Sequence, residues 1–193
     1  MNANLKFCAF AGIVYLVSFL PELTIETLRE FGQINGISST LLRITYIVST
    51  LSTIFFYAGF IVLGNKYKNN LLLVGALIII LTTIFYYIYE WYTVDISEVE
   101  KNIVGASALL LYGFSGIVFG VGLYRIKDVF GYLASAAAIL EITIGIFFVT
   151  IVLFLLGLIL TIPAIIFEIL LLFKASELST VNDAVRNDFE RSG

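Results

Sequence analysis

Charged residues divide this chain into long apolar stretches. Residues 44–65 lie between Arg43 and Lys66, residues 102–124 lie between Lys101 and Arg125, and neither stretch contains a charge. A bilayer hydrocarbon core about 30 Å thick is crossed by ~20 helical residues. Because lipid offers no hydrogen bonds, a single apolar segment can satisfy its backbone there only as a helix. These stretches therefore predict membrane-spanning helices.

The composition supports a lipid environment for most of the chain. Hydrophobic residues make up 60% of the 193 residues and charged residues 13%, and the mean hydropathy is +1.03. An ordinary soluble domain has about 25% charged residues. We expect an integral membrane protein whose fold is an all-α helical bundle.

We expect six spans, within one membrane domain over residues 1–174, at about residues 3–20, 44–65, 69–89, 102–124, 129–148 and 151–173. The first is short enough to resemble a signal peptide, but no A-x-A cleavage site follows it, so we expect it to be retained. Residues 175–193 form a polar segment, expected to be a short cytoplasmic tail. Thr180 could cap a short helix there, from Val181 onward.

The last two spans are predicted from a stretch that has no loop signal. Between Val129 and Phe173 only Glu141 and Glu168 interrupt the apolar residues. As one helix this stretch would reach ~68 Å, more than twice the hydrocarbon thickness. We therefore predict two spans joined by a tight turn near residues 147–152. The alternative is a break at Gly157, with Pro163 starting a shorter last helix.

The distribution of basic residues indicates the orientation. With six spans, one side of the membrane receives eight of the 11 basic residues: Lys6, Lys66, Lys68, Arg125, Lys127, Lys174, Arg186 and Arg191. The other side receives Arg29, Arg43 and Lys101 beside a larger number of carboxylates. Loops rich in Lys and Arg stay in the cytoplasm. We expect a multi-pass protein of the cell membrane with both termini cytoplasmic.

Two segments on the predicted outer side have amphipathic character. Residues 23–34 place Ile25, Leu28 and Phe31 on one helical face, which is typical of a helix lying on the membrane surface; an ordered loop is the alternative. Residues 85–92, FYYIYEWY, are rich in Tyr and Trp, which favour the level where a span leaves the membrane.

Gly113-Phe114-Ser115-Gly116 resembles the serine motif of rhomboid-type intramembrane proteases. In that family a histidine on another span takes the serine proton, and this sequence contains no histidine. Small residues also let membrane helices approach closely. We therefore predict a helix-packing face, with the partner helix in this chain or in another, formed by Gly113, Ser115, Gly116 and Gly120.

Several classes of site lack their usual ligands. The chain has no His, one Cys (Cys8) and one Met (Met1), whereas haem, copper and most zinc sites use these side chains. We expect no cofactor, no metal and no catalytic residue. The formal charge of −3 lacks the clustered Lys and Arg of phosphate-backbone binding, so we expect no nucleic-acid partner.

Glu141 and Glu168 are the candidate intramembrane polar residues. Glu141 falls near the middle of its span, where a charge costs about 2.5 kcal/mol or more. It is interpreted as protonated, hydrogen-bonded to a hydroxyl, or paired with a basic residue of a partner. A proton or cation site and a neutral structural carboxyl are both open. Glu168 lies nearer the cytoplasmic end, and we expect it to extend toward the interface.

The C-terminal half has a basic loop (Arg125-Ile126-Lys127), a paired apolar stretch and a phenylalanine-rich exit. In this order of features it resembles a group of small archaeal and bacterial multi-spanning proteins catalogued as a domain of unknown function. The resemblance implies a small α-helical membrane protein. It implies no activity and no functional residue.

Three classes of function follow. The favoured one is a non-catalytic accessory subunit of a larger membrane complex, with other membrane subunits and lipid as partners; it explains the missing ligands and a Glu141 that a partner could neutralise. The alternative is a small homo-oligomeric transporter or channel that uses Glu141. A membrane enzyme acting on lipid is least favoured, because no positioned base or metal is evident.

Overall fold

The described residues form an all-α structure. A computed structural model describes residues 2–30, 38–93 and 98–192, which contain helices and no strand. The helices are α1 (Asn2–Glu30), α2 (Ser38–Lys66), α3 (Asn70–Thr93), α4 (Glu98–Tyr124), α5 (Lys127–Phe130), α6 (Tyr132–Val149) and α7 (Phe154–Ser192). The predicted fold class is confirmed.

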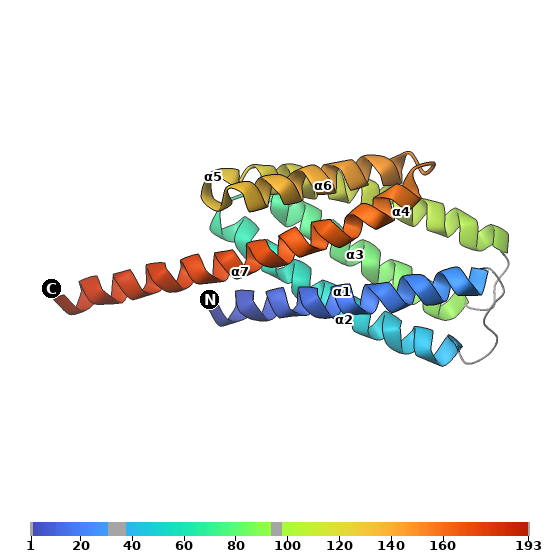
Figure 1. Ribbon diagram of the computed structural model, residues 1–193, viewed down its shortest axis with the longest axis horizontal. Helices are drawn as coiled ribbons and strands as arrows, with labels where there is room; N and C mark the ends of the chain where they lie inside the picture. Colours follow the sequence, from blue (N-terminus) through green and yellow to red (C-terminus); the bar gives the residue numbers. More distant parts are fainter. Residues whose placement is uncertain (1, 31–37, 94–97, 193) are drawn as a thin grey trace.

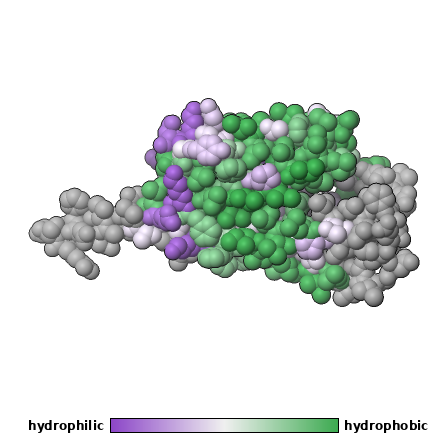
Figure 2. All heavy atoms as spheres, in the orientation of Figure 1, coloured by the Kyte–Doolittle hydropathy of each residue, from purple (hydrophilic) through white to green (hydrophobic). Residues whose placement is uncertain are grey.

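Six of these helices are long and apolar enough to cross a membrane. Their candidate spans are Asn4–Glu22, Arg43–Lys66, Asn70–Tyr92, Ile103–Tyr124, Tyr132–Val149 and Phe154–Thr180. The visible face of the bundle is mostly hydrophobic, and hydrophilic residues gather near the end from which the C-terminal helix projects (Figure 2). The chain is a multi-pass membrane protein.

The six long helices form a closed ring. The principal contacts follow the chain, α1 with α2, α2 with α3, α3 with α4, α4 with α6 and α6 with α7, and α7 then contacts α1. Successive long helices run in opposite directions (Figure 1). The ring therefore encloses an interior to which every span contributes a face.

Aromatic side chains fill part of this interior. The rings of Phe60 and Phe119 meet edge to face at 5.0 Å, and Phe56 and Tyr57 pack against them at 5.6 and 5.4 Å respectively. Phe56, Phe60 and Phe119 have no exposed surface. Edge-to-face packing suits the charge distribution of aromatic rings. This cluster joins α2 to α4 across the bundle.

The turn between the last two spans occupies residues 150–153, because α6 ends at Val149 and α7 begins at Phe154. Ile151 has a left-handed backbone, with φ of 57°. Gly157 does not break the helix; a methyl group there would lie 2.6 Å from the ring of Phe148, so the glycine permits a close contact. α7 also continues through Pro163.

Three details differ from the sequence-based expectations. α1 continues through Pro21 to Glu30 as one helix, so this part of residues 23–34 is not a separate surface helix; residues 31–37 lie outside the described residues. Thr180 caps no new helix, since its hydroxyl donates to the Ser176 carbonyl (3.0 Å) within α7. The short helix α5 was not predicted, and it delays the start of α6 to Tyr132.

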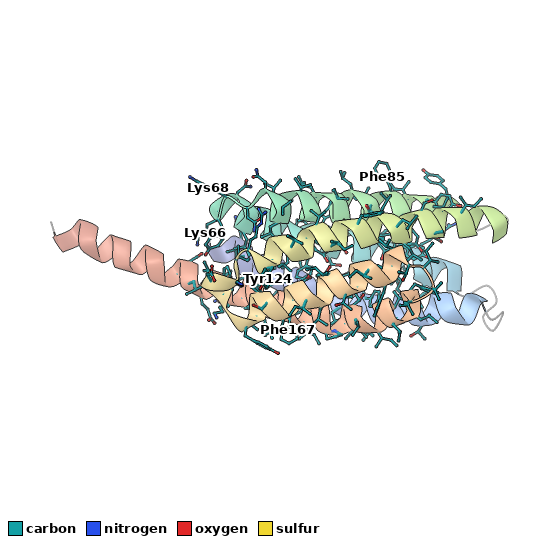
Figure 3. The ribbon with its side chains drawn as sticks, turned by 90° about the horizontal axis from the view of Figure 1, so that it is seen from above. Lys66, Lys68, Phe85, Tyr124 and Phe167 are labelled. Atoms are coloured by element: carbon teal, nitrogen blue, oxygen red, sulfur yellow. The ribbon has the colours of Figure 1, made fainter. Side chains whose placement is uncertain are left out.

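Both termini lie at the same end of the bundle (Figure 1). We call this the terminal end; the opposite end contains the turn at residues 150–153. Lys66 and Lys68 lie at the terminal end, and Phe85 lies toward the opposite end (Figure 3). At that opposite end the Arg43 guanidinium stands 5.2 Å from the centre of the Trp91 ring. A cation over an indole ring is a favourable pairing where a span leaves the membrane.

Candidate functional site

Glu141 lies on the inward face of α6. The buried residues of this helix recur at spacings of three and four: Ala134, Ala137, Ala138, Glu141, Ile144 and Gly145. This spacing places them on one side of a helix. Glu141 is only 7% exposed, so its carboxyl belongs to the interior of the ring. The remaining members of the stripe are small or aliphatic and offer it no charge.

Glu168 is also buried, and the expectation that it extends toward the interface is wrong. Its side chain has 0% exposure, in register with Ile165 and Leu172 on the same side of α7. The direction of a helical side chain is set by the phase of its helix. Because the neighbours at i−3 and i+4 pack into the core, Glu168 enters the core with them. Proximity along the sequence to Lys174 does not change this direction.

The carboxyl groups of Glu141 and Glu168 interact directly across the α6–α7 contact. Neither oxygen of Glu168 has a donor partner in the structure. Ionised carboxylates only accept hydrogen bonds, so the two groups can bond to one another only when one of them carries a proton. Two adjacent negative charges in a low-dielectric interior would repel strongly. One proton held between the two groups satisfies both constraints.

The surroundings of this carboxyl pair contain hydroxyls but no neutralising base. The phenol groups of Tyr15 and Tyr57 lie within electrostatic range of both carboxyls. On the α4 side, a methyl group at Gly116 would lie 3.3 Å from the Glu141 Oε2 atom. No Lys or Arg is buried in the part of the chain that the structure describes. The pair therefore depends on proton binding for its charge balance.

The glycines of the predicted packing face bring α4 against α6. A methyl group at Gly113 would lie 2.8 Å from the Gly145 carbonyl oxygen, and one at Gly120 would lie 3.0 Å from that of Ala138. Such contacts exclude any larger side chain without movement of the backbone. The partner helix of this face lies in the same chain, and the close approach presents Gly116 to Glu141.

Ser115 lies beside these glycines and is buried. It is 1% exposed, and its hydroxyl donates to the Tyr112 carbonyl of the preceding turn at 3.0 Å. A nucleophilic serine needs a base to accept its proton. The motif therefore contributes a small buried side chain to helix packing.

A third buried carboxyl, Glu22, was not recognised from the sequence as a site residue. It is 6% exposed. The Ser49 hydroxyl donates to its Oε2 atom (2.7 Å) and the Tyr87 hydroxyl donates to its Oε1 atom (2.6 Å). Ser18 Oγ lies 3.1 Å from Ser49 Oγ. We call these four residues the Glu22 cluster. Ser18 and Glu22 are four residues apart, which is the signal that could have indicated a shared polar face.

Hydroxyl groups lie between the Glu22 cluster and the carboxyl pair. Tyr15 is within electrostatic range of Glu22, Glu141 and Glu168. Beside it, the Tyr112 hydroxyl donates to Thr83 Oγ1 at 2.9 Å. Toward the terminal end lies a layer of fully buried apolar residues, Phe60, Leu63, Leu123 and Leu172, and beyond it the buried polar residues Asn69, Ser176 and Ser179. The polar interior therefore extends from the carboxyl pair toward the end opposite the termini.

Comparison of the chain with protein-family models, with curated proteins and with solved structures found no match. The resemblance of the C-terminal half to small multi-spanning proteins therefore stays a prediction.

Proposed function

We propose that this protein is a small proton channel or proton-coupled transporter, and that the Glu141–Glu168 pair is its protonation site. The observation that carries the proposal is the direct contact of two carboxyls inside a ring of six apolar helices. Ionisable groups within spans are costly, and they commonly mark proton relays and ion pathways. Leucine side chains at these two positions would fill the same space without the free-energy cost of burying carboxyl groups.

Proton binding at this pair supplies a driving force for a conformational change. With one proton the carboxyls attract each other and hold α6 against α7. Loss of that proton leaves two negative charges that repel within the same contact, and water or a movement of the helices must then stabilise them. A contact that favours one helix arrangement when protonated and another when charged is a two-state element.

The polar interior suggests the direction from which protons reach the pair. Glu22 and the hydroxyls of Tyr87, Tyr112 and Tyr15 lead from the opposite end toward the middle of the bundle. Phe60 and Leu172 obstruct the remaining distance to the terminal end. In this arrangement the pair exchanges protons with the opposite side, and release toward the terminal side requires the apolar layer to open.

The test is a proton-flux measurement on the purified full-length protein in phosphatidylcholine liposomes with a trapped pH-sensitive dye. We expect a pH gradient, with potassium and valinomycin clamping the membrane potential, to dissipate faster than in protein-free liposomes. Glu141→Gln and Glu168→Gln should each abolish the difference, because an amide cannot release a proton at these pH values.

The matched control is Glu177→Gln, on the same helix but at an exposed position, which should conduct like the wild type. Equal flux in wild-type and protein-free liposomes would contradict a passive channel. A proton-coupled transporter would then show proton flux only when its substrate is present outside the liposomes. If no solute in a panel of small metabolites produced proton flux, the proposal of a proton-coupled transporter would be contradicted as well.

We also infer the membrane and the orientation. The basic residues that the structure describes at the terminal end are Lys6, Lys66, Lys68, Arg125, Lys127 and Lys174. Because basic loops remain in the cytoplasm, this end is assigned to the cytoplasm and the protein to the cell membrane. In this orientation the Glu22 cluster is nearer the outer side, and the carboxyl pair receives its protons from there.

An accessory subunit of a larger membrane complex is the second candidate. The observation that favours it is the length of α7, which extends past the other helices at the terminal end and would offer a partner a long surface (Figure 1). Purification in a mild detergent from the native membrane tests this role. Membrane subunits recovered in constant proportion would support it, whereas a preparation of this chain alone that conducts protons supports the first candidate.

A further inference from the structure

A pocket at the terminal end lies between the α2–α3 loop and the end of α4. Its volume is about 200 Å³, and it is lined by Tyr67, Lys68, Asn69, Arg125, Ile126 and Val129. The lining thus combines two basic side chains with an amide, a phenol and two aliphatic residues. None of these residues takes part in the carboxyl pair or the Glu22 cluster.

The pocket has a fixed frame, which Asn69 provides. Its side-chain amide donates to the Gly122 carbonyl at 2.7 Å, and its Oδ1 atom accepts from the Leu72 backbone N–H at 3.2 Å. Asn69 is 5% exposed, so these bonds are shielded from water. Lys68, the preceding residue, has a left-handed backbone with φ of 52°. The α2–α3 loop is thereby bound to the end of α4, and the Lys68–Arg125 pair is held across a defined gap.

The charges around the pocket are mostly positive. Lys68 and Arg125 are both exposed. Lys127 follows closely and donates to the Tyr124 hydroxyl at 2.9 Å, which raises the pKa of its ammonium and keeps it charged. Asp128 is the acidic residue of α5, adjacent to this lysine. Burial raises the pKa of the Tyr67 phenol, which therefore remains a neutral hydrogen-bond donor.

Two other lysines near this end join helices. Lys66 Nζ donates to Ser179 Oγ at 2.9 Å, and Lys174 Nζ donates to the Phe130 carbonyl at 3.1 Å. They hold α7 to α2 and α5. In the part of the chain that the structure describes, Lys68 and Arg125 do not join helices in this way. Both are exposed and line the pocket, so their charges are available to a ligand.

We propose that this pocket binds the phosphate group of an anionic phospholipid from the adjacent leaflet. The guanidinium of Arg125 and the ammonium of Lys68 are suited to phosphate oxygens, and Arg can donate two parallel hydrogen bonds. The pocket lies where the spans ending at Lys66 and Tyr124 leave the membrane, which is the level of lipid headgroups. Basic pockets between spans on the cytoplasmic side are recurrent headgroup sites. Exposed Val129 and Tyr124 flank it with apolar surface for the acyl chains.

This proposal is independent of proton transport, and its test measures lipid binding alone. The full-length protein in detergent is titrated with phosphatidylglycerol and, separately, with phosphatidylcholine, and the bound lipid is counted by native mass spectrometry. We expect phosphatidylglycerol to bind at least about tenfold more tightly. Lys68→Gln and Arg125→Gln should each remove about tenfold in affinity, which corresponds to one charge-assisted contact of about 1.4 kcal/mol.

The control is Lys6→Gln, a basic residue that is exposed near the same end but does not line the pocket. It should leave the affinity for phosphatidylglycerol unchanged. An equal loss of phosphatidylglycerol affinity in all three variants would overturn the proposed binding pocket, because it would show that the lipid is attracted by the general surface charge. Equal binding of phosphatidylglycerol and phosphatidylcholine by the wild type would also overturn the proposal. This comparison needs no variant, so it remains decisive even if a variant fails to fold.

Inorganic phosphate distinguishes the two sources of the phosphate group. Added at millimolar concentration, it should displace little of the bound phosphatidylglycerol, because the lipid also buries its acyl chains against the protein. Full displacement, with inorganic phosphate itself retained by the wild type and lost in Arg125→Gln, would overturn the lipid assignment and indicate a soluble phosphate ligand.

Discussion

At the scale of single residues, the three buried carboxyls differ in how they are stabilised. Glu22 accepts a hydrogen bond at each oxygen, from Ser49 and Tyr87. Neither oxygen of Glu168 accepts a hydrogen bond from a hydroxyl or a base, and its interaction with Glu141 requires one proton between the two carboxyls. A buried polar atom without a partner costs about 1–3 kcal/mol. Glu22 thus belongs to a hydrogen-bonded network that stabilises the fold. Burial of Glu168 costs free energy instead, and a role in proton transport would explain its presence.

This difference predicts opposite effects of replacing the carboxyl pair and of replacing Glu22. The double substitution Glu141→Leu with Glu168→Leu should leave the free energy of unfolding unchanged or raise it by about 1 kcal/mol, since it replaces both members of a buried carboxyl pair with apolar side chains of similar size. It should also abolish proton flux. Thermal unfolding in detergent, followed by circular dichroism and tryptophan fluorescence, measures the stability change.

Glu22→Leu is the matched comparison on α1. It removes the acceptor of Ser49 and Tyr87 and should lower the free energy of unfolding by about 1–3 kcal/mol. If the double substitution destabilised the protein as much as Glu22→Leu does, the carboxyl pair would be a net stabilising contact like the Glu22 cluster, and the cost that proton transport is proposed to explain would be absent.

At the scale of elements, the α4–α6 contact positions the candidate site. Gly113, Gly116 and Gly120 on α4 face Gly145, Glu141 and Ala138 on α6 in turn. Because these side chains are absent or small, the two backbones approach closely, and Glu141 is pressed toward the interior rather than toward lipid. The packing face predicted from the sequence and the intramembrane carboxyl therefore belong to the same interface.

Gly113→Ala should separate these helices. The new methyl group would lie 2.8 Å from the Gly145 carbonyl oxygen and 2.7 Å from Val149 Cγ2, and overpacking of this kind costs about 1–3 kcal/mol. We expect a lower unfolding temperature and reduced proton flux. Gly105→Ala, on the same helix, is the control: nothing lies within 4 Å of its added methyl group, so its stability should stay equal or rise slightly. Equal destabilisation by both substitutions would contradict the packing argument.

At the scale of the whole molecule, the ring of spans and the placement of charge together define its sidedness. The α1–α7 contact closes the ring, so the first and last spans are neighbours and both termini leave the same end. Lys66 and Lys68 lie at that end as well (Figure 3), where hydrophilic residues gather (Figure 2). The even number of spans and the charge asymmetry agree with one another, although they derive from different properties of the chain.

Thiol labelling tests the sidedness. In a Cys8→Ser background, which removes the buried native thiol, Val152→Cys introduces a thiol in the turn at the opposite end, where Val152 is 87% exposed. Lys68→Cys introduces one at the terminal end. A membrane-impermeant maleimide should label Val152→Cys in intact bacterial cells and Lys68→Cys only after permeabilisation. The reverse pattern would place the termini outside and reverse the proposed direction of proton entry.

Much of the architecture could be predicted because lipid imposes it locally. An apolar stretch of sufficient length becomes a helix whatever its neighbours are, since its backbone has no other partner in hydrocarbon. The six spans follow from that requirement. Helix ends were less predictable: α1 continues past Glu22 to Glu30, and α7 continues past Thr180 to Ser192, because helical bonding carries on into water wherever no residue stops it.

The candidate site could be predicted only in part. Glu141 was identified from its depth in a span, a property of the sequence alone. Its contact with Glu168, and the burial of Glu22 beneath Ser49 and Tyr87, depend on the rotation of each helix about its axis and on which helices are neighbours. Each of these spans is apolar on nearly every face. The periodicity of its hydrophobic residues therefore does not show which face points into the bundle.

The sequence by itself thus determined how often the chain crosses the membrane, because each segment meets lipid independently of the others. Tertiary structure decided which polar groups meet inside, because that depends on the closure of the ring through α1 and α7 and on the close glycine contact of α4 with α6. Glu141 and Glu168 come from different spans, and their carboxyls interact only because α6 and α7 pack together.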